Sequence, residues 1–219
     1  TKDVPNSNLF NISVGGSMND QTHFKNFQYN KGSGTDFLGF DNGLRSLNGG
    51  INATLRPMNN GYDLLNNGLN NDWSIKNRKP IADLSLSMNI AHRWVSESGR
   101  TLAMLGAVNY SNTYKTYLNM DNNLYGAYDI THDRSNYLRK GVDDQYNHNV
   151  RVGAMLNLTY VPASGNNRYE FKNIFNQLGK DRYTYRKGTD AQSDYEESAE
   201  YYYQSRTTYS GQFTGKHTW

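Results

Sequence analysis

Apolar and polar residues alternate over long stretches of the chain, most clearly across residues 146–160. A period of two predicts an extended strand with two unlike faces. At roughly 15 residues, this strand would be far longer than the usual 5–6. The polar second face argues against burial on both sides. One face holds Tyr146, His148, Val150, Val152, Ala154, Leu156, Leu158 and Tyr160, and the other holds Asn147, Asn149, Arg151, Gly153, Met155, Asn157 and Thr159.

The same pattern recurs along the chain and predicts about six long strands. Short turns are expected near 96–100 and 162–167, and longer loops near 30–72, 118–144 and 186–199. Short turns at one end and long loops at the other are typical of outer-membrane barrels. A soluble sandwich would show shorter strands with more regular turn signals. The six strands are predicted at residues 9–29, 84–94, 101–117, 146–160, 168–185 and 201–219.

Strand length also favours a membrane-spanning strand. From Val150 to Leu158 there are eight steps of about 3.3 Å, which at a tilt of roughly 40° span about 20 Å, close to the ~25 Å apolar band of membrane barrels. Tyr146 and Tyr160 would then lie near the two headgroup layers, where aromatic rings are favoured. We therefore expect the even-numbered residues of this strand to face lipid and the odd-numbered ones to face the lumen.

Composition agrees with a β-protein that exposes half of each strand to water. Hydrophobic content is 36% and mean hydropathy is -0.88, yet the chain holds 18 Tyr, 8 Phe and 3 Trp, too many aromatic residues for a disordered chain. The net charge of +3 is too balanced to predict a nucleic-acid partner. The absence of Cys excludes a disulfide framework, a thiolate metal site and a Cys nucleophile. No window of about 18 apolar residues predicts a transmembrane helix.

Several segments, in one order, resemble TonB-dependent outer-membrane receptors. The closest likeness is to the branch whose barrel follows a carboxypeptidase-regulatory-like amino-terminal domain, and it covers nearly the whole chain. The segments are GTDFLGFDNGLRSL at 34–47, NYSNTY at 109–114, NVRVGAM at 149–155, EFKNIFNQ at 170–177 and YYYQSRTTY at 201–209.

This resemblance implies an antiparallel transmembrane β-barrel of 22 strands with an internal plug, energised by TonB. In the family the plug, the TonB box and the signal peptide precede the region represented here. We therefore expect residues 1–219 to be part of one barrel domain of a larger receptor, because six strands are too few to close a membrane barrel. The implied location is the cell outer membrane. The implied partners are the lipid bilayer, the TonB complex through the plug, and a nutrient ligand, and a surface lipoprotein lid remains open.

We find no catalytic, cofactor-binding or metal-binding residues in the sequence, and we expect no enzyme. Residues 121–126 look faintly like a calcium loop but lack the fifth-position oxygen ligand, and His132 stands where the closing Glu belongs. An ordinary polar loop is the simpler interpretation, and it also accounts for Asp129, Asp133, Asp143 and Asp144 nearby. No spacing typical of metal ligands is found among the five histidines, which are His23, His92, His132, His148 and His217. We interpret His92, His148 and His217 as interfacial residues near strand ends.

Other polar and aromatic groups have both a structural and a functional interpretation. Asp41-Asn42-Gly43 is turn chemistry that could also shape a loop over the lumen. Tyr201-Tyr202-Tyr203 could form an aromatic girdle or a sugar-stacking platform, and we favour the girdle. Four cations on the lumen phase are expected to form charge ladders with Glu170 and other polar neighbours rather than to contact substrate or plug. These cations are Arg151, Arg206, Lys172 and Lys216.

The leading hypothesis is a barrel portion of a TonB-dependent importer, which binds a scarce nutrient at its outer loops and passes it inward when TonB displaces the plug. One alternative is a passive porin or a structural outer-membrane protein. A second alternative, from another class, is a soluble or surface-attached β-rich adhesin or binding module.

Overall fold

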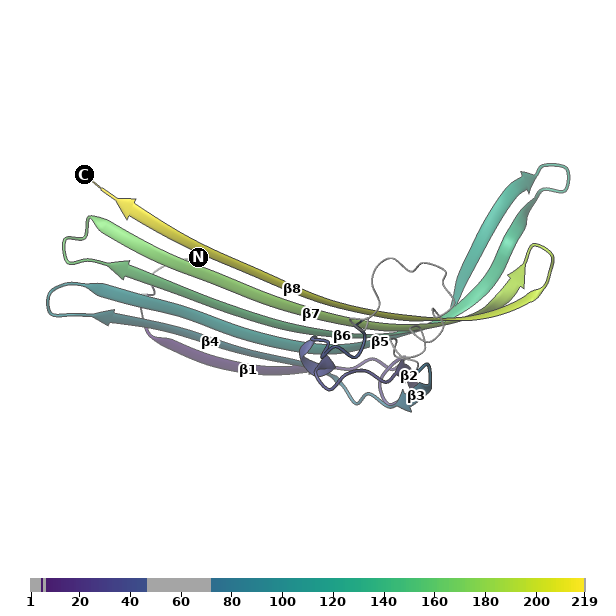
Figure 1. The fold of residues 1–219 in the computed structure, drawn as a ribbon, viewed down its shortest axis with the longest axis horizontal. Helices are drawn as coiled ribbons and strands as arrows, with labels where there is room; N and C mark the ends of the chain where they lie inside the picture. The colour runs from purple at the N-terminus through teal and green to yellow at the C-terminus, as the bar shows by residue number, and fades with distance from the viewer. Residues whose placement is uncertain (1–4, 6, 47–71, 219) are drawn as a thin grey trace, which may run out of the picture.

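A computed structural model describes residues 5, 7–46 and 72–218 of the chain. Its elements are strands joined by turns, with one short 3-10 helix (Figure 1). Within the described residues, no helix is both long enough and apolar enough to cross a membrane. The elements are β1 (Leu9–Ser17), β2 (Phe27–Asn30), η1 (Asp36–Leu38), β3 (Ile75–Arg78), β4 (Asp83–Val95), β5 (Thr101–Asp129), β6 (Arg134–Val161), β7 (Asn167–Asp190) and β8 (Tyr195–His217).

Six strands form one antiparallel sheet in the order β1-β4-β5-β6-β7-β8, and β2 pairs with β3 in a separate small sheet. Within the described residues the large sheet is open, with β1 and β8 at its edges. The all-β antiparallel architecture predicted from the alternating pattern is therefore confirmed, and β4 agrees with its predicted bounds to within one residue.

Two predicted long loops are wrong. Segments 118–144 and 186–199 consist mostly of strand, because β5 and β6 extend to a turn at 130–133 and β7 and β8 extend to a turn at 191–194. The pairing of β5 with β6 is interrupted between Tyr117 and Met120, next to Asn119, which has φ 55°. Such bulges bend a strand and increase its twist. Figure 1 shows the far ends of both hairpins curving away from the sheet.

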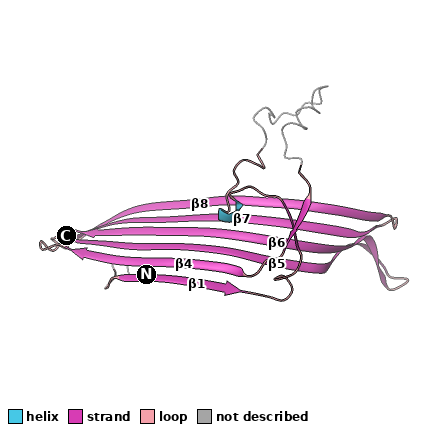
Figure 2. Cartoon of the chain, turned by 90° about the horizontal axis from the view of Figure 1, so that it is seen from below, coloured by secondary structure: helices cyan, strands magenta, loops and turns pink. Residues whose placement is uncertain are grey.

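The predicted first strand is also shorter than expected. β1 ends at Ser17, and Phe27 begins β2 outside the large sheet. Between them the backbone turns at residues 20–24, where Phe24 has φ 62°. The chain from residue 19 to 46, with the described residues 72–80, lies against one side of the large sheet (Figure 2). We call these residues the covering segment.

The alternation of side chains gives the large sheet two faces. The apolar face holds the even-numbered residues of β1, β4, β6 and residues 102–116 of β5, and the odd-numbered residues of β7 and β8. The polar face holds the alternate residues. The register confirms that Val150, Val152 and Leu156 share the apolar face with one another and with their cross-strand neighbours, as the pattern predicted.

The apolar face has two unlike halves. From the short turns up to about the row of Val152 its side chains are exposed or partly exposed, and we call this the bare half. Farther along the same strands the covering segment lies over it, and Val150 is 2% exposed and Tyr146 is 7% exposed. Exposed side chains of the bare half include Phe10, Ile12, Val14, Leu86, Met88, Trp94, Leu102, Val108, Leu156, Tyr160, Tyr169, Phe171, Tyr209 and Phe213.

Candidate functional site

The covering segment is anchored to the sheet at the carbonyl of Gly39. The side chains of Gln177 and Ser205 both donate hydrogen bonds to this oxygen. Gly39 has φ 81°, which favours glycine, and a Cβ added to Gly179 would lie only 2.5 Å from the Gly39 Cα. The two glycines therefore let two backbones approach closely at the centre of the contact.

An aromatic cluster fills the space beside this anchor. Phe27 is 1% exposed and meets the rings of Tyr114 and Tyr146 edge-on, at centroid distances of 5.4 and 5.5 Å. The guanidinium of Arg78 lies over the ring of Tyr29 at 4.4 Å. Tyr146 is therefore a packing residue beneath the covering segment, and its predicted position in a lipid headgroup layer is wrong.

The edge of the covering segment nearest the bare half is also tied to the sheet. Tyr110 donates its hydroxyl to the carbonyl of Phe37 at 2.9 Å, and Phe40 stacks on Phe175 with centroids 6.4 Å apart. Phe37 itself is 56% exposed.

A compact ion cluster holds residues 33–45 in shape. The Arg45 guanidinium donates to Asp36 and to Asp41, each at 2.7 Å, and lies 3.7 Å from the centre of the Tyr203 ring. Burial alone would raise the pKa of Asp36, but hydrogen bonds from Arg45 and Ser33 outweigh it and lower this pKa. Asp36 and Asp41 both bind Arg45 and so stabilise the conformation of residues 33–45.

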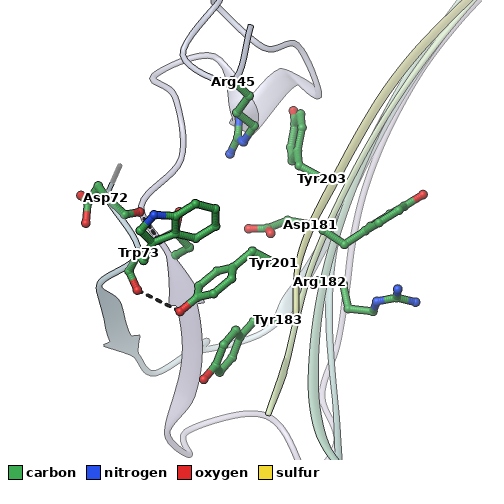
Figure 3. Close-up of a pocket in the computed structure, with 10 residues that line it drawn as sticks. Arg45, Asp72, Trp73, Asp181, Arg182, Tyr183, Tyr201 and Tyr203 are labelled. Atoms are coloured by element: carbon green, nitrogen blue, oxygen red, sulfur yellow. Dashed lines mark hydrogen bonds between the residues drawn. The ribbon is translucent and has the colours of Figure 1, made fainter. Parts of the chain in front are cut away.

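A cleft of about 330 Å³ opens between this cluster and strands β7 and β8. Aromatic rings form one wall: Trp73 meets Tyr201 at 5.3 Å, and Tyr201 meets Tyr183 at 5.3 Å. The Tyr201 hydroxyl donates to the carbonyl of Trp73 at 2.9 Å, which fixes the ring (Figure 3). The lining residues are Asn30, Arg45, Asp72, Trp73, Asp181, Arg182, Tyr183, Tyr201, Tyr202 and Tyr203.

Asp181 is the carboxylate at the back of the cleft, between the rings of Tyr203 and Tyr201 (Figure 3). Burial raises its pKa to about 6, against the opposing effect of the positive charges on Arg45 and Arg78. Its pairing partner on β6, His148, stacks on Tyr114 with ring centroids 4.5 Å apart and forms a hydrogen bond with the Asn112 side chain at 2.9 Å. Burial, reinforced by Arg78, lowers the pKa of His148 to about 3, so the ring is neutral at pH 7.

The cleft has the composition of a binding site. Aromatic rings, carboxylates and guanidinium groups together can hold a ligand that has both apolar and hydrogen-bonding surface. Within the described residues, no group of three or more His, Asp or Glu side chains is arranged to hold a metal ion.

The tyrosine triplet is divided between the two faces and does not form the girdle that we favoured. Tyr201 and Tyr203 line the cleft on the apolar face. Tyr202 lies on the polar face, where the Arg182 guanidinium is 4.8 Å from its ring.

The turn at Asp41-Asn42-Gly43 is confirmed. Asp41 accepts from the amide of Gly43 at 3.0 Å, and Gly43 has φ 95°. This turn belongs to the covering segment, so it lies over the apolar face and does not shape a loop over the polar face.

Two interpretations of the acidic segment and the histidines are corrected. Residues 121–126 lie within strand β5, so they form neither a calcium loop nor an ordinary polar loop. Asp143 lies in β6 and binds the Arg186 guanidinium at 2.6 and 2.7 Å. His148 lies beneath the covering segment instead of at an interface, whereas His92 packs on Trp94 near a short turn, with centroids 4.1 Å apart.

Sequence reasoning missed the residues that make the cleft distinctive. Asp181 left a signal, because it is a charged residue on the apolar phase of its strand. Arg45 could also have been noticed, because it follows Asp41 by four residues, which is the spacing of the ion pair that the two form. Trp73 left no signal, because it meets Tyr201 only through the tertiary fold.

Compared with protein-family models, with curated proteins and with solved structures, the chain has no match in any of the three.

Proposed function

We propose that this chain is a barrel segment of a TonB-dependent outer-membrane receptor that imports a nutrient. The observation that carries the proposal is the bare half of the apolar face. From Tyr160 to Val152 it covers eight residue steps, or about 20 Å across the membrane at a tilt of roughly 40°. The opposite face of the same strands is polar, as the lumen wall of such a barrel requires.

Both borders of the bare half have the side chains that a membrane interface favours. Near the short turns, Trp94 and the stacked pair Tyr160 and Tyr169 form an aromatic belt. At the other border lie Tyr110 and the exposed Phe37 of the covering segment. Tyr and Trp rings are favoured at the headgroup level because they combine an apolar body with a polar tip.

A polar side chain in the middle of the bare half has its hydrogen bonds satisfied there. Asn173 accepts a hydrogen bond from the Tyr209 hydroxyl at 2.6 Å and donates to the carbonyl of Leu156 at 3.4 Å. An amide without partners would be costly in lipid, so this pairing supports the same placement.

In this proposal the covering segment and its cleft lie outside the membrane on the extracellular side. The cleft would provide an outer contact for a ligand, and the polar face would line the path that opens when TonB displaces the plug. The family-like segments support the energised step, and the sheet supports the membrane barrel.

The membrane placement can be tested with single cysteines, because the chain contains none. In the full-length protein in lipid vesicles, Val108→Cys and its neighbour Asn109→Cys would each carry a fluorescent label. We expect a lipid-borne nitroxide to quench the label at 108 and aqueous iodide to quench the label at 109. Equal quenching at both positions by iodide would reject the membrane placement and favour the soluble module.

The energised step needs a separate test. Uptake of candidate nutrients by cells carrying the full-length protein should cease when TonB is deleted or the proton motive force is collapsed. Uptake that persists under both conditions would favour the passive porin, and it would leave the quenching result unaffected.

A further inference from the structure

Among the described residues, the polar face carries arginines that have no acidic partner, although other cations on this face are paired. Elsewhere on this face the expected charge ladder exists, since Lys172 binds Glu170 at 2.7 Å and Arg182 binds Glu200 at 2.8 Å. Arg151 and Arg206, by contrast, have no carboxylate partner among the residues that the structure describes. The ladder interpretation therefore holds at Glu170 and fails for this pair.

The two arginines flank one residue. Leu178 of β7 pairs with Arg151 of β6 on one side and with Arg206 of β8 on the other. Two strand spacings separate the arginine backbones by about 10 Å, so both side chains can reach one group held above Leu178. Like charges this close repel each other, and a bound anion would relieve that repulsion.

A hollow of about 450 Å³ lies between these side chains. This volume is within the range of small-molecule sites. The Asn109 amide at one side of the hollow lies over Gly153, where an added Cβ would meet it at 2.5 Å. The polar side chains around the hollow, besides the two arginines, are Asn109, Asn176 and Thr208.

We propose that this hollow binds the carboxylate or phosphate group of a small polar molecule, with Arg151 and Arg206 as its charged contacts. Guanidinium groups match both anions through paired N–H donors. The surrounding amides and the Thr208 hydroxyl can both donate and accept, so they suit the uncharged remainder of such a molecule. This inference rests on the proposed function in one respect only, namely that the polar face lines the import path.

Lys180 strengthens the positive field of the hollow. It lies one row from Arg206 on the same face and, among the described residues, pairs with no carboxylate; its ammonium is 6.0 Å from the centre of the Tyr202 ring. Three cations within a few rows attract an anion from solution, and salt screens this attraction.

The test is a binding titration on the full-length protein in detergent at low ionic strength. The probes are glucuronate, its uncharged counterpart glucose, and inorganic phosphate. Glucuronate should bind more tightly than glucose, and Arg151→Gln and Arg206→Gln should each weaken glucuronate binding at least about tenfold. Comparing glucuronate with phosphate identifies which anion the hollow prefers. Arg93→Gln is the matched control, since it removes one charge from the same face near the short turns.

Three results would overturn the proposal. The first is an equal loss of affinity in the Arg93→Gln control, which would indicate only a diffuse field. The second is equal binding of glucose and glucuronate. The third is no anion binding together with a loosened plug in the arginine variants, which would show that an acidic protein segment fills the hollow.

If a glutamine variant fails to fold, Arg151→Lys keeps the charge without the paired donors, and an intermediate loss of affinity is then expected. Anion binding in a protein whose uptake proves independent of TonB would keep this inference and reject the proposed transport step.

Discussion

The two halves of the apolar face have the same alternating pattern but different surroundings. In the bare half the side chains of Leu156, Phe171 and Phe213 are exposed, whereas in the covered half Phe27 packs over Tyr146 and Tyr183. The alternating pattern therefore identifies an apolar face, but it does not show whether protein or lipid covers that face. The covering segment does so in one half, and in our proposal lipid does so in the other.

The polar residues within each half distinguish the two environments. Strand β7 carries Phe171 and Phe175 in the bare half, Gln177 at the border, and Gly179 and Asp181 in the covered half. A neighbouring protein segment can satisfy such groups, as the Gly39 carbonyl satisfies Gln177. Lipid offers no partners, and the amide of Asn173 in the bare half is satisfied within the sheet.

The largest effect is expected from a charge placed in the middle of the bare half. Leu156→Arg in the full-length protein should reduce the free energy of folding into lipid vesicles by about 2–4 kcal/mol, the cost of Arg near a bilayer midplane. The matched control is Asn157→Arg, one residue along on the polar face. Urea titration in vesicles measures both, and equal losses would mean that the two faces do not meet different solvents.

A smaller effect should follow from Gly179→Ala in the covered half. The added Cβ would collide with the Gly39 backbone, and overpacking of this kind costs about 1–3 kcal/mol. The control variant is Gly215→Ala. Gly215 lies on the same face in the bare half, and a Cβ added there would meet the Tyr169 ring at 3.7 Å, an ordinary van der Waals distance. Hydrogen exchange of residues 19–46 should accelerate only in the first variant, and unchanged exchange there would refute the anchor at Gly39.

The sequence was sufficient to predict the strands where alternation is strict and insufficient where it breaks. β4 is bounded by Pro80 and by the turn at 96–100, so its limits were visible. The outer parts of β5 and β6 are irregular because bulges near Tyr117 and Tyr125 shift the phase. A bulge breaks the period of two, so the predicted end of β5 is too early and the predicted start of β6 is too late.

The candidate site was less predictable because it is assembled from distant segments. Trp73 and Tyr201 are 128 residues apart when they form their hydrogen bond, and Gln177 and Gly39 are 138 residues apart. The charges at Arg45 and Asp181 were visible in the sequence, but the cleft between them follows from the way residues 19–46 fold back over the sheet. No local pattern encodes that contact.

The smallest effect is expected from pH, because two groups in the covered half oppose each other. His148 has a folded pKa of about 3 against an ordinary 6.5, so its contribution to stability is lost as pH falls below 6.5. Asp181 has a folded pKa of about 6 against 3.8, so its burial cost is relieved as pH falls below 6. Between about pH 6 and pH 4 the two nearly cancel, and the contact should change little.

Single variants should expose each contribution to this balance. Asp181→Asn should make the contact weaken on acidification from pH 6 to pH 4, and His148→Gln should make it strengthen, each by at most about 1.4 kcal/mol per pH unit. The reporter is the hydrogen-exchange protection of the Thr116 amide, which donates to the buried Thr22 hydroxyl at 2.9 Å, corrected for intrinsic exchange. Parallel pH profiles in both variants would contradict the opposition, since removal of two opposing groups must move the profile in opposite directions.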